Sequence, residues 1–159
     1  MSVKWYSTAM AVTWRTLEAS GEFAEIFPEG NRIKVASASQ THPEKPSLTT
    51  IDYPQCTVFP TGATHNTRAS FSQRSRDLTL VAEIVTGEDR IDTALKAAEI
   101  IEGAIEIVRG KVKDETIITA IMLLDATAFR RSLGGDDVRA GWVAEVPIRC
   151  IMHSAPVGG

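Results

Sequence analysis

The feature that most constrains the fold is a long β-hairpin in the C-terminal third of the chain. Two runs rich in apolar and β-branched residues, 115–131 and 138–152, flank a loop in which Gly-Gly precedes two aspartates. A glycine pair with acidic residues between two such runs is typical of a hairpin turn. A straight arm would span about 50 Å at roughly 3.3 Å per residue, whereas a domain of this length is about 40 Å across. We therefore expect the hairpin to bend, or its tip to reach a partner.

The two arms of this hairpin differ in how their apolar residues are distributed. In the second arm, apolar residues occupy alternate positions from Val138 to Met152, so one face of this arm is expected to be buried. In the first arm, the stretch 117–124 is apolar on both faces, which favours a central position in the sheet or cover on both sides. Pro147 has no backbone donor, so it predicts an edge register or a bulge at which the hairpin bends.

Two helices are predicted outside the hairpin. Apolar residues at helical spacing indicate a helix over 8–20, with Gly21 as its stop and a further turn at 22–27. A longer helix is expected over 89–109, because its apolar residues form a broad face and Gly110 follows its last turn.

Three further strands are expected, and two polar segments separate them. Short strands are predicted at 32–36 and 51–59, and the clearest strand is 78–86, where apolar residues alternate. The segment 37–50 has one large apolar residue and is expected to be an extended polar loop. The polar segment 61–77 is expected to begin as a loop, and its last part either continues this loop or extends the following strand.

This order of elements predicts an α+β fold in a single domain spanning 1–159. The sheet should be mixed and mainly antiparallel, with the two helices packed on one face and the hairpin at 115–152 closing it. A chain of 159 residues with 43% hydrophobic and 23% charged residues is ordinary for one globular domain. The formal charge of −3 gives no attraction to nucleic acid or to an anionic membrane. No apolar run is long enough to span a bilayer, and the N-terminus lacks a signal-peptide layout, so we expect synthesis in a cytoplasm.

The residue types that usually carry chemistry are few. Cys56 and Cys150 lie on apolar strand candidates and are expected to be buried, reduced thiols. The three histidines, His42, His65 and His153, are too far apart for a local metal-ligand motif. No glycine pair lies between a strand and a helix, and no Gly-x-Ser-x-Gly occurs. The sequence therefore predicts no metal, no cofactor and no catalytic residue.

An acidic stripe on the predicted long helix is one candidate functional site. Glu99, Glu102 and Glu106 follow one another at helical spacing. They form either a solvated helix face or the lining of a wet channel that repels polyanions.

The predicted hairpin tip is a second candidate site. Arg130 and Arg131 precede the turn, and Asp136 and Asp137 lie within it, so charges crowd together at this end. The cluster either keeps the turn soluble or pairs with charges on a neighbouring subunit, where it would orient docking.

Three arginines in the polar segment form a third candidate site. Arg68, Arg74 and Arg76 surround Phe71, a combination that can contact nucleic acid. The neighbouring Asp77 and the acidic total charge favour solvated or interface arginines instead.

Several segments resemble the tail terminator, or tail-completion, proteins of tailed bacteriophages, and closely related neck and minor tail proteins. They are PEGNRIK at 28–34, the loop that leads to IDYP at 51–54, and LVAEIVTG at 80–87, together with the long helix and the closing hairpin. The resemblance extends from about Thr8 to Met152 and concerns the order and character of the elements.

The resemblance implies a non-enzymatic structural protein of the virion, located in the tail or neck and made in the host cytoplasm. Such proteins form a ring, usually a hexamer, at the head-proximal end of the tail tube, where they end tube growth and join the tail to the head. The implied partners are further copies of the chain, the tail tube protein and the head–tail connector protein. DNA would pass through the lumen without sequence-specific binding, and no membrane would be involved. A ring subunit uses heterologous interfaces, in which two different patches meet.

Two other classes of function remain open on the sequence. One is a small oligomeric enzyme in which Glu99, Glu102 or His153 from different subunits meet at an intersubunit site. The other is a ligand-binding α+β module that uses the sheet face left without helices.

Overall fold

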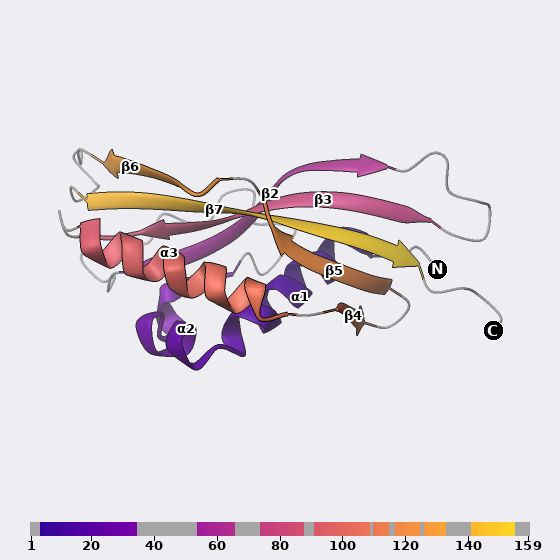
Figure 1. The fold of residues 1–159 in the computed structure, drawn as a ribbon, viewed down its shortest axis with the longest axis horizontal. Coiled ribbons are helices and arrows are strands. Elements are labelled where there is room, and N and C mark those ends of the chain that lie inside the picture. The colour runs from indigo at the N-terminus through magenta and orange to yellow at the C-terminus, as the bar shows by residue number, and fades with distance from the viewer. Residues whose placement is uncertain are drawn as a thin grey trace.

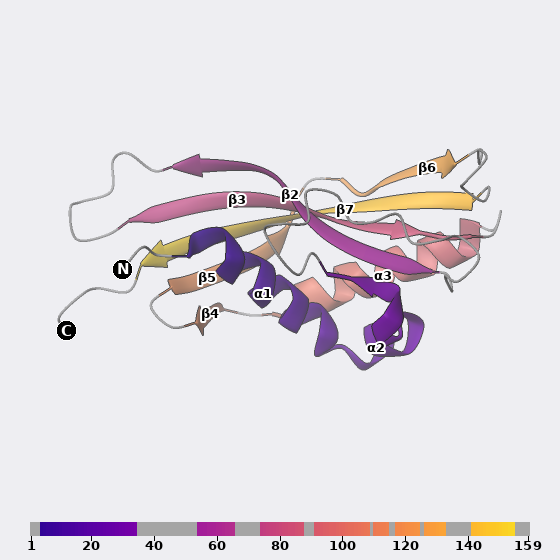
Figure 2. The same ribbon diagram turned by 180° about the vertical axis from the view of Figure 1, so that it is seen from behind.

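The structure is a computed structural model with an α+β fold, as the sequence predicts. Helices lie on one face of a curled, mixed sheet of seven strands (Figures 1 and 2). The described residues are 4–34, 54–65, 74–87, 91–108, 110–114, 117–124, 126–132 and 141–154. The helices are α1 (Trp5–Glu18), α2 (Gly21–Ile26) and α3 (Ile91–Glu106), with a 3-10 turn at Glu29–Asn31. The strands are β1 (Arg32–Ile33), β2 (Gln55–His65), β3 (Ser75–Val85), β4 (Lys111–Asp114), β5 (Ile117–Leu123), β6 (Ala128–Ser132) and β7 (Gly141–Ser154).

The strand order is β1-β2-β3-β7-β5-β4, with β6 beside β5 on the same edge of β7. The β1–β2 pair is parallel and the other described pairs are antiparallel. β3 pairs with β7 in an uninterrupted register from Ser75 opposite His153 to Val85 opposite Val143. The predicted polar loop at 37–50 lies outside the described residues.

The long hairpin is present, but its first arm consists of two strands. β7 runs for 14 residues, and it pairs with β5 from Ile148 to Ser154 and with β6 from Gly141 to Glu145. Between β5 and β6 the chain leaves the ladder. The first arm of the hairpin is therefore interrupted. The second arm, β7, is continuous and pairs with β3 along most of its own length (Figure 1). The turn itself, 133–140, lies outside the described residues.

Pro147 lies opposite the gap in the first arm. It causes no register shift with β3, where its partner is Val81, so the predicted bulge in β7 is absent. Its carbonyl oxygen accepts a hydrogen bond from the backbone N–H of Leu124 at 3.0 Å. In an antiparallel strand the nitrogen and carbonyl of one residue point to the same side. The nitrogen of Pro147 therefore faces the gap between β5 and β6. Proline has no N–H to donate, and at the gap no strand hydrogen bond requires one.

The boundaries of several other elements differ from the prediction. Gly21 does not end the helical region but begins α2, because Ser20 caps this helix through its hydroxyl oxygen, which accepts from the Phe23 N–H at 3.3 Å. The segment Thr61–His65, expected to be a loop, continues β2 beyond a register shift between Pro60 and Gly62. β4 was not predicted, since Lys111–Asp114 is too polar and short to show an apolar pattern.

The core lies between the helices and the inner face of the sheet. The inner residues of β3 and β7 alternate as predicted: Leu80, Ala82, Val146, Ile148 and Met152 are fully buried. α3 covers them with small side chains, including Ala97 and Ala98, so the helix lies close to the sheet. Its larger residues Ile101 and Ile105 fill the remaining space.

The two cysteines are buried, as expected, on inner positions of β2 and β7. Burial raises the pKa of the Cys56 thiol to about 12 and that of Cys150 to about 11. Both thiols therefore stay protonated and unreactive near neutral pH.

Candidate assembly surfaces

The two predicted groups of arginines lie at opposite ends of the sheet. Arg130 pairs with Val143 at the start of β7, whereas Arg76 pairs with Met152 near its end. Val143 and Met152 are nine residues apart, which corresponds to about 30 Å along a strand. The two groups therefore form separate surfaces. Arg68, Asp136 and Asp137 lie outside the described residues.

Arg130 lies on the outer face of the sheet, opposite the helices, between two carboxylates. Its Nε is 3.5 Å from Glu145 Oε1, and its Nη2 is 3.9 Å from Glu83 Oε2. Glu83 and Glu145 are direct cross-strand partners, an arrangement in which like charges repel. Burial, and then the neighbouring Glu145, raise the pKa of Glu83, while Arg130 opposes this rise. Arg130 thus relieves a repulsion within its own subunit, although 61% of its side chain remains exposed.

Phe129 and Arg131 point to the other face of the same strand. Their partners in β7 are Ala144 and Trp142, which lie on the helix side of the sheet. Phe129 is 38% exposed, which is high for an aromatic residue. Among the described strands, β6 pairs only with β7. We refer to Phe129, Arg130 and Arg131 as the β6 edge.

At the opposite end, Arg76 holds α1 against the sheet. Its guanidinium lies 5.3 Å from the ring centroid of Trp5, a cation–π contact. The hydroxyl of Tyr6, also in α1, lies 3.3 Å from His65 Nε2 in β2. The backbone of Arg74 bonds with Ser154 in both directions, closing the end of the β3–β7 pair. The contact with Trp5 gives Arg76 a structural role within the subunit.

The acidic stripe lies along α3, as the helical spacing predicts. Glu99 and Glu106 are exposed, and Glu102 is partly buried. Glu102 Oε1 accepts a hydrogen bond from the Thr127 hydroxyl at 2.5 Å, so this side of the helix faces the connection between β5 and β6. His153, the remaining residue of the enzyme hypothesis, pairs with Ile118 on the outer face. The stripe and His153 are therefore on opposite sides of the sheet within one subunit.

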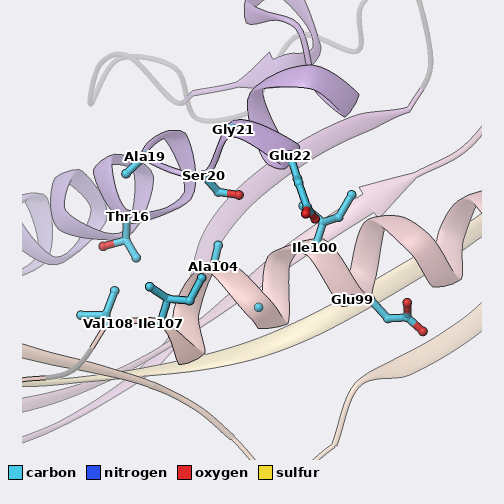
Figure 3. Close-up of a pocket in the computed structure, with 11 residues that line it drawn as sticks. Thr16, Ala19, Ser20, Gly21, Glu22, Glu99, Ile100, Ala104, Ile107 and Val108 are labelled. Atoms are coloured by element: carbon cyan, nitrogen blue, oxygen red, sulfur yellow. The ribbon is translucent and has the colours of Figure 1, made fainter.

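A groove separates the α1–α2 junction from α3 (Figure 3). We call it the helix groove, and it encloses about 610 Å³. A smaller hollow between α2 and α3 shares Glu22 and Ile100 with it and extends it toward Glu25 and Lys96. The residues that line the helix groove include Thr16, Ala19, Glu22, Ile100, Gly103 and Ile107. Sequence patterns could not reveal it, because it forms where three helices meet.

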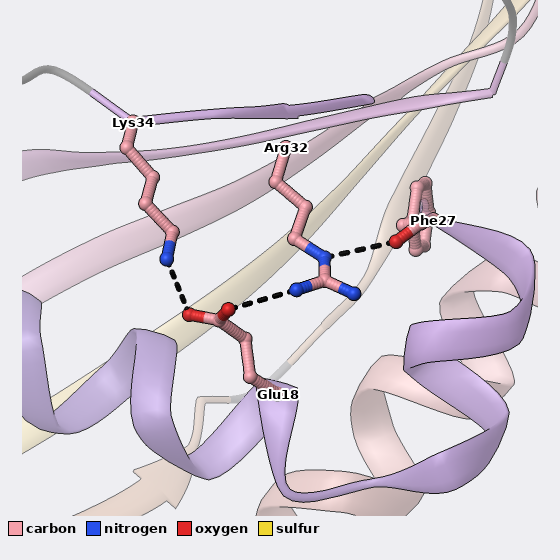
Figure 4. A network of polar contacts seen from close by, with 4 residues as sticks. All are labelled: Glu18, Phe27, Arg32 and Lys34. Atoms are coloured by element: carbon pink, nitrogen blue, oxygen red, sulfur yellow. Dashed lines mark hydrogen bonds and ion pairs between the residues drawn. The ribbon is translucent and has the colours of Figure 1, made fainter. Parts of the chain in front are cut away.

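A second feature that the sequence did not predict is the salt bridge network between α1 and the segment 32–34, which contains β1 (Figure 4). Glu18 Oε1 is 2.6 Å from Lys34 Nζ, and Glu18 Oε2 is 2.8 Å from Arg32 Nη1. The Arg32 Nε also donates to the carbonyl oxygen of Phe27 at 2.9 Å. The hydrogen bond from Lys34 is the main cause of the lowered pKa of Glu18. These partners are 14 and 16 residues apart in the sequence, so no local pattern connects them.

The outer face of the sheet carries one further ion pair and several apolar side chains. Arg149 in β7 donates to both carboxylate oxygens of Asp77 in β3, through Nε at 2.9 and 2.8 Å and also through Nη2. This pairing raises the pKa of Arg149. Around this pair, register places partly buried apolar residues on the same face, namely Phe59, Val81, Met122, Pro147 and Ile151.

Searches of protein-family models and of curated proteins found no match to this chain. Among the helices that the structure describes, none is both long and apolar enough to cross a membrane. Within the described ranges, no three His, Cys, Asp or Glu side chains come together in a way that could hold a metal ion.

Proposed function

We propose that this protein is a structural component of a phage virion that forms a ring at the head-proximal end of the tail tube. The ring ends tube growth and presents a surface to the head–tail connector. The proposal starts from the resemblance of segments 28–34, 51–54 and 80–87 to tail terminator proteins, in the order of elements that these proteins have.

The observation that carries the proposal is the one-sided cover of the sheet. The described helices all lie on the inner face (Figures 1 and 2). On the outer face, no described helix or strand covers the partly buried residues Phe59, Val81, Met122 and Ile151. Contiguous apolar surface with charged side chains around it is characteristic of protein–protein contact. A subunit that stacks on a tube and joins its neighbours in a ring needs such a surface.

The acidic stripe agrees with the passage of DNA through the proposed ring. Glu99 and Glu106 are exposed and have no ion-pair partner among the described residues. Carboxylates that line a channel repel phosphates, which lets DNA slide without binding. The proposed position of this stripe is the lumen of the ring.

Tail tubes offer the direct test. Tubes assembled from the tube protein of the same genome would be incubated with this protein and imaged by electron microscopy. We expect density at one end of each tube and no further growth when free tube protein is added. Bare tube ends that continue to elongate would overturn the proposal.

A matched pair of variants tests the outer face in the same assay. Val81→Lys and Ile151→Lys place charges among its apolar residues, and the register of β3 and β7 keeps both side chains on this face. We expect both variants to fold and to lose tube binding. Leu95→Lys, at a position that is 40% exposed on α3, provides the control and should still bind.

A further inference from the structure

The helix groove is an apolar site with an acidic rim. Ala19, Ile100 and Ile107 form its apolar walls, and Ile107 is 78% exposed, the largest exposure among the large hydrophobic residues of the described chain. The two hollows together are lined by three carboxylates, Glu22, Glu25 and Glu99, and by one lysine, Lys96. A surface of this kind suits a partner that brings an apolar side chain flanked by positive charge.

Gly103 opens the wall of the groove on α3. A Cβ atom added at this position would have no heavy atom within 4 Å, so the glycine borders empty space. It lies in the interior of a helix, where glycine is a poor helix former compared with residues that carry a side chain. The glycine therefore leaves room in the groove but lowers the stability of the helix.

The β6 edge has the complementary composition. Phe129 is exposed, and Arg130 and Arg131 are its next neighbours in the strand. The contacts of Arg130 with Glu83 and Glu145 are long and solvent-exposed, so a stronger acidic partner can replace them. The β6 edge and the groove share no residue, and they lie on different elements (Figures 1 and 3).

We propose that the β6 edge of one copy of this chain docks into the helix groove of the next copy. Phe129 would fill the space beside Gly103 and Ile107, and the arginines would face the carboxylates of α2, Glu22 and Glu25. Because two different patches meet, every docked copy presents a further groove and a further edge, so the contact leads to a closed ring or a filament. The inference deepens the proposed function, since it names the contact on which the ring would rest. Each contact is small, and ring closure strengthens it by making the last one intramolecular.

Two single variants each remove one half of the proposed contact. Gly103→Leu fills the groove without a clash at its Cβ, and Phe129→Ser removes the aromatic residue from the edge. Ile91→Ser is the matched control, because Ile91 is 42% exposed on α3 but belongs to neither surface. Thermal unfolding of each variant establishes that it folds before association is measured.

Sedimentation velocity at concentrations up to millimolar is the measurement. We expect the wild type and Ile91→Ser to associate beyond dimers, more strongly at low salt, and Gly103→Leu and Phe129→Ser to be monomeric. An equimolar mixture of the two monomeric variants should form dimers and nothing larger. Such a mixture retains one intact groove and one intact edge, on different molecules.

Three results would overturn the inference: a wild type that stays monomeric at millimolar concentration, either variant associating as the wild type does, or a mixture that fails to form dimers. These measurements contain no tail tubes. A protein that associates through the groove but leaves tube ends bare would refute the proposed function alone. Capping of tubes by Gly103→Leu would refute the groove contact alone.

Discussion

Two charged clusters in this protein have inverse compositions, and the difference separates a contact that holds the fold from one that is available to a partner. In the first cluster, one carboxylate, Glu18, bonds two cations, Arg32 and Lys34, at 2.8 and 2.6 Å. In the second, one cation, Arg130, lies between two carboxylates at 3.5 and 3.9 Å. The Arg32 side chain is 11% exposed and that of Arg130 is 61% exposed. The contacts of the first cluster are short and its Arg32 is shielded from water, whereas the contacts of the second cluster are long and its Arg130 is hydrated.

The pKa shifts of the glutamates in the two clusters have opposite signs and different causes. Two cations lower the pKa of Glu18, so folding favours its charged form. Burial and a neighbouring carboxylate raise the pKa of Glu83, so folding favours its protonated form. The excess of carboxylates in the second cluster leaves it able to accept further positive charge.

The largest loss of stability should come from a substitution at Gly141, the first residue of β7, which is the strand that carries Glu145 of the second cluster. A Cβ at Gly141 would lie 2.0 Å from the carbonyl oxygen of Thr86, so Gly141→Ala forces β7 away from its neighbour. We expect a loss of about 3 kcal/mol in the free energy of unfolding, measured with urea. Gly62→Ala, where the nearest atom is 3.6 Å away, should cost much less. Equal losses of stability in the two variants would mean that the backbone at Thr86 shifts to make room for the added methyl group.

Removing the charge of Glu18 should have the next largest effect on the free energy of unfolding. Glu18→Gln leaves the shielded Arg32 without its carboxylate and removes the bond to Lys34. We expect a loss of about 2 kcal/mol in the free energy of unfolding at neutral pH. The loss should shrink at acidic pH, where the wild-type carboxylate is protonated as well. A loss that is independent of pH would contradict a charge-based role.

The pH dependence of stability distinguishes the two clusters by sign. The folded pKa of Glu18 is below its ordinary value of 4.5, so its contribution is fully present above pH 4.5 and is lost as the pH falls through the folded value. The folded pKa of Glu83 is above 4.5, so its contribution is present at low pH and is lost as the pH rises from 4.5 through the folded value.

Glu83→Gln tests this sign directly. The variant removes a charge that folding disfavours, so we expect it to gain roughly 0.5 kcal/mol over the wild type at pH 7 and to lose this gain near pH 4. Urea unfolding at several pH values provides the measurement. If the variant were less stable than the wild type at pH 7, its ion pair with Arg130 would outweigh the repulsion from Glu145.

Neutralising Arg130 should have the smallest effect on the fold. Its side chain is mostly exposed, so Arg130→Gln should change the free energy of unfolding by no more than about 0.5 kcal/mol. In the sedimentation assay, the same variant should weaken association, because the β6 edge loses a charge. A large loss of stability would place Arg130 with Arg32 as a residue that the fold requires. Reversal to glutamate is less informative, since it would place a third carboxylate beside Glu83 and Glu145.

The elements that the sequence predicted correctly are those whose burial is strongly periodic. The alternation from Trp142 to Met152 identified the inner face of β7, and the alanine-rich face of α3 was found by its helical spacing. The predicted strand boundaries were wrong where the local residue pattern differs from what the tertiary environment of the segment favours. Thr61–His65 is exposed and polar, yet it continues β2 because β3 offers it a partner. The apolar run after Ile117 suggested one long strand, yet it divides opposite Pro147.

The candidate surfaces were less predictable than the fold. Glu99, Glu102 and Glu106 were recognised as a stripe because helical spacing is a local property. Arg76 and Arg130 were assigned to two different candidate sites, but only the register of β7 shows that these sites lie at opposite ends of the sheet.

The sequence by itself determined the α+β class, the order of the helices and main strands, and the buried faces of α3, β3 and β7. These properties depend on residue type and spacing within a segment, where the period of the backbone sets which side chains share a face. The tertiary structure alone decided the gap opposite Pro147, the pairing of Glu18 with Arg32 and Lys34, the helix groove, and the separation of the arginine clusters. Each of these depends on distances between segments far apart in the chain, which only the packing of the whole sheet and its helices sets.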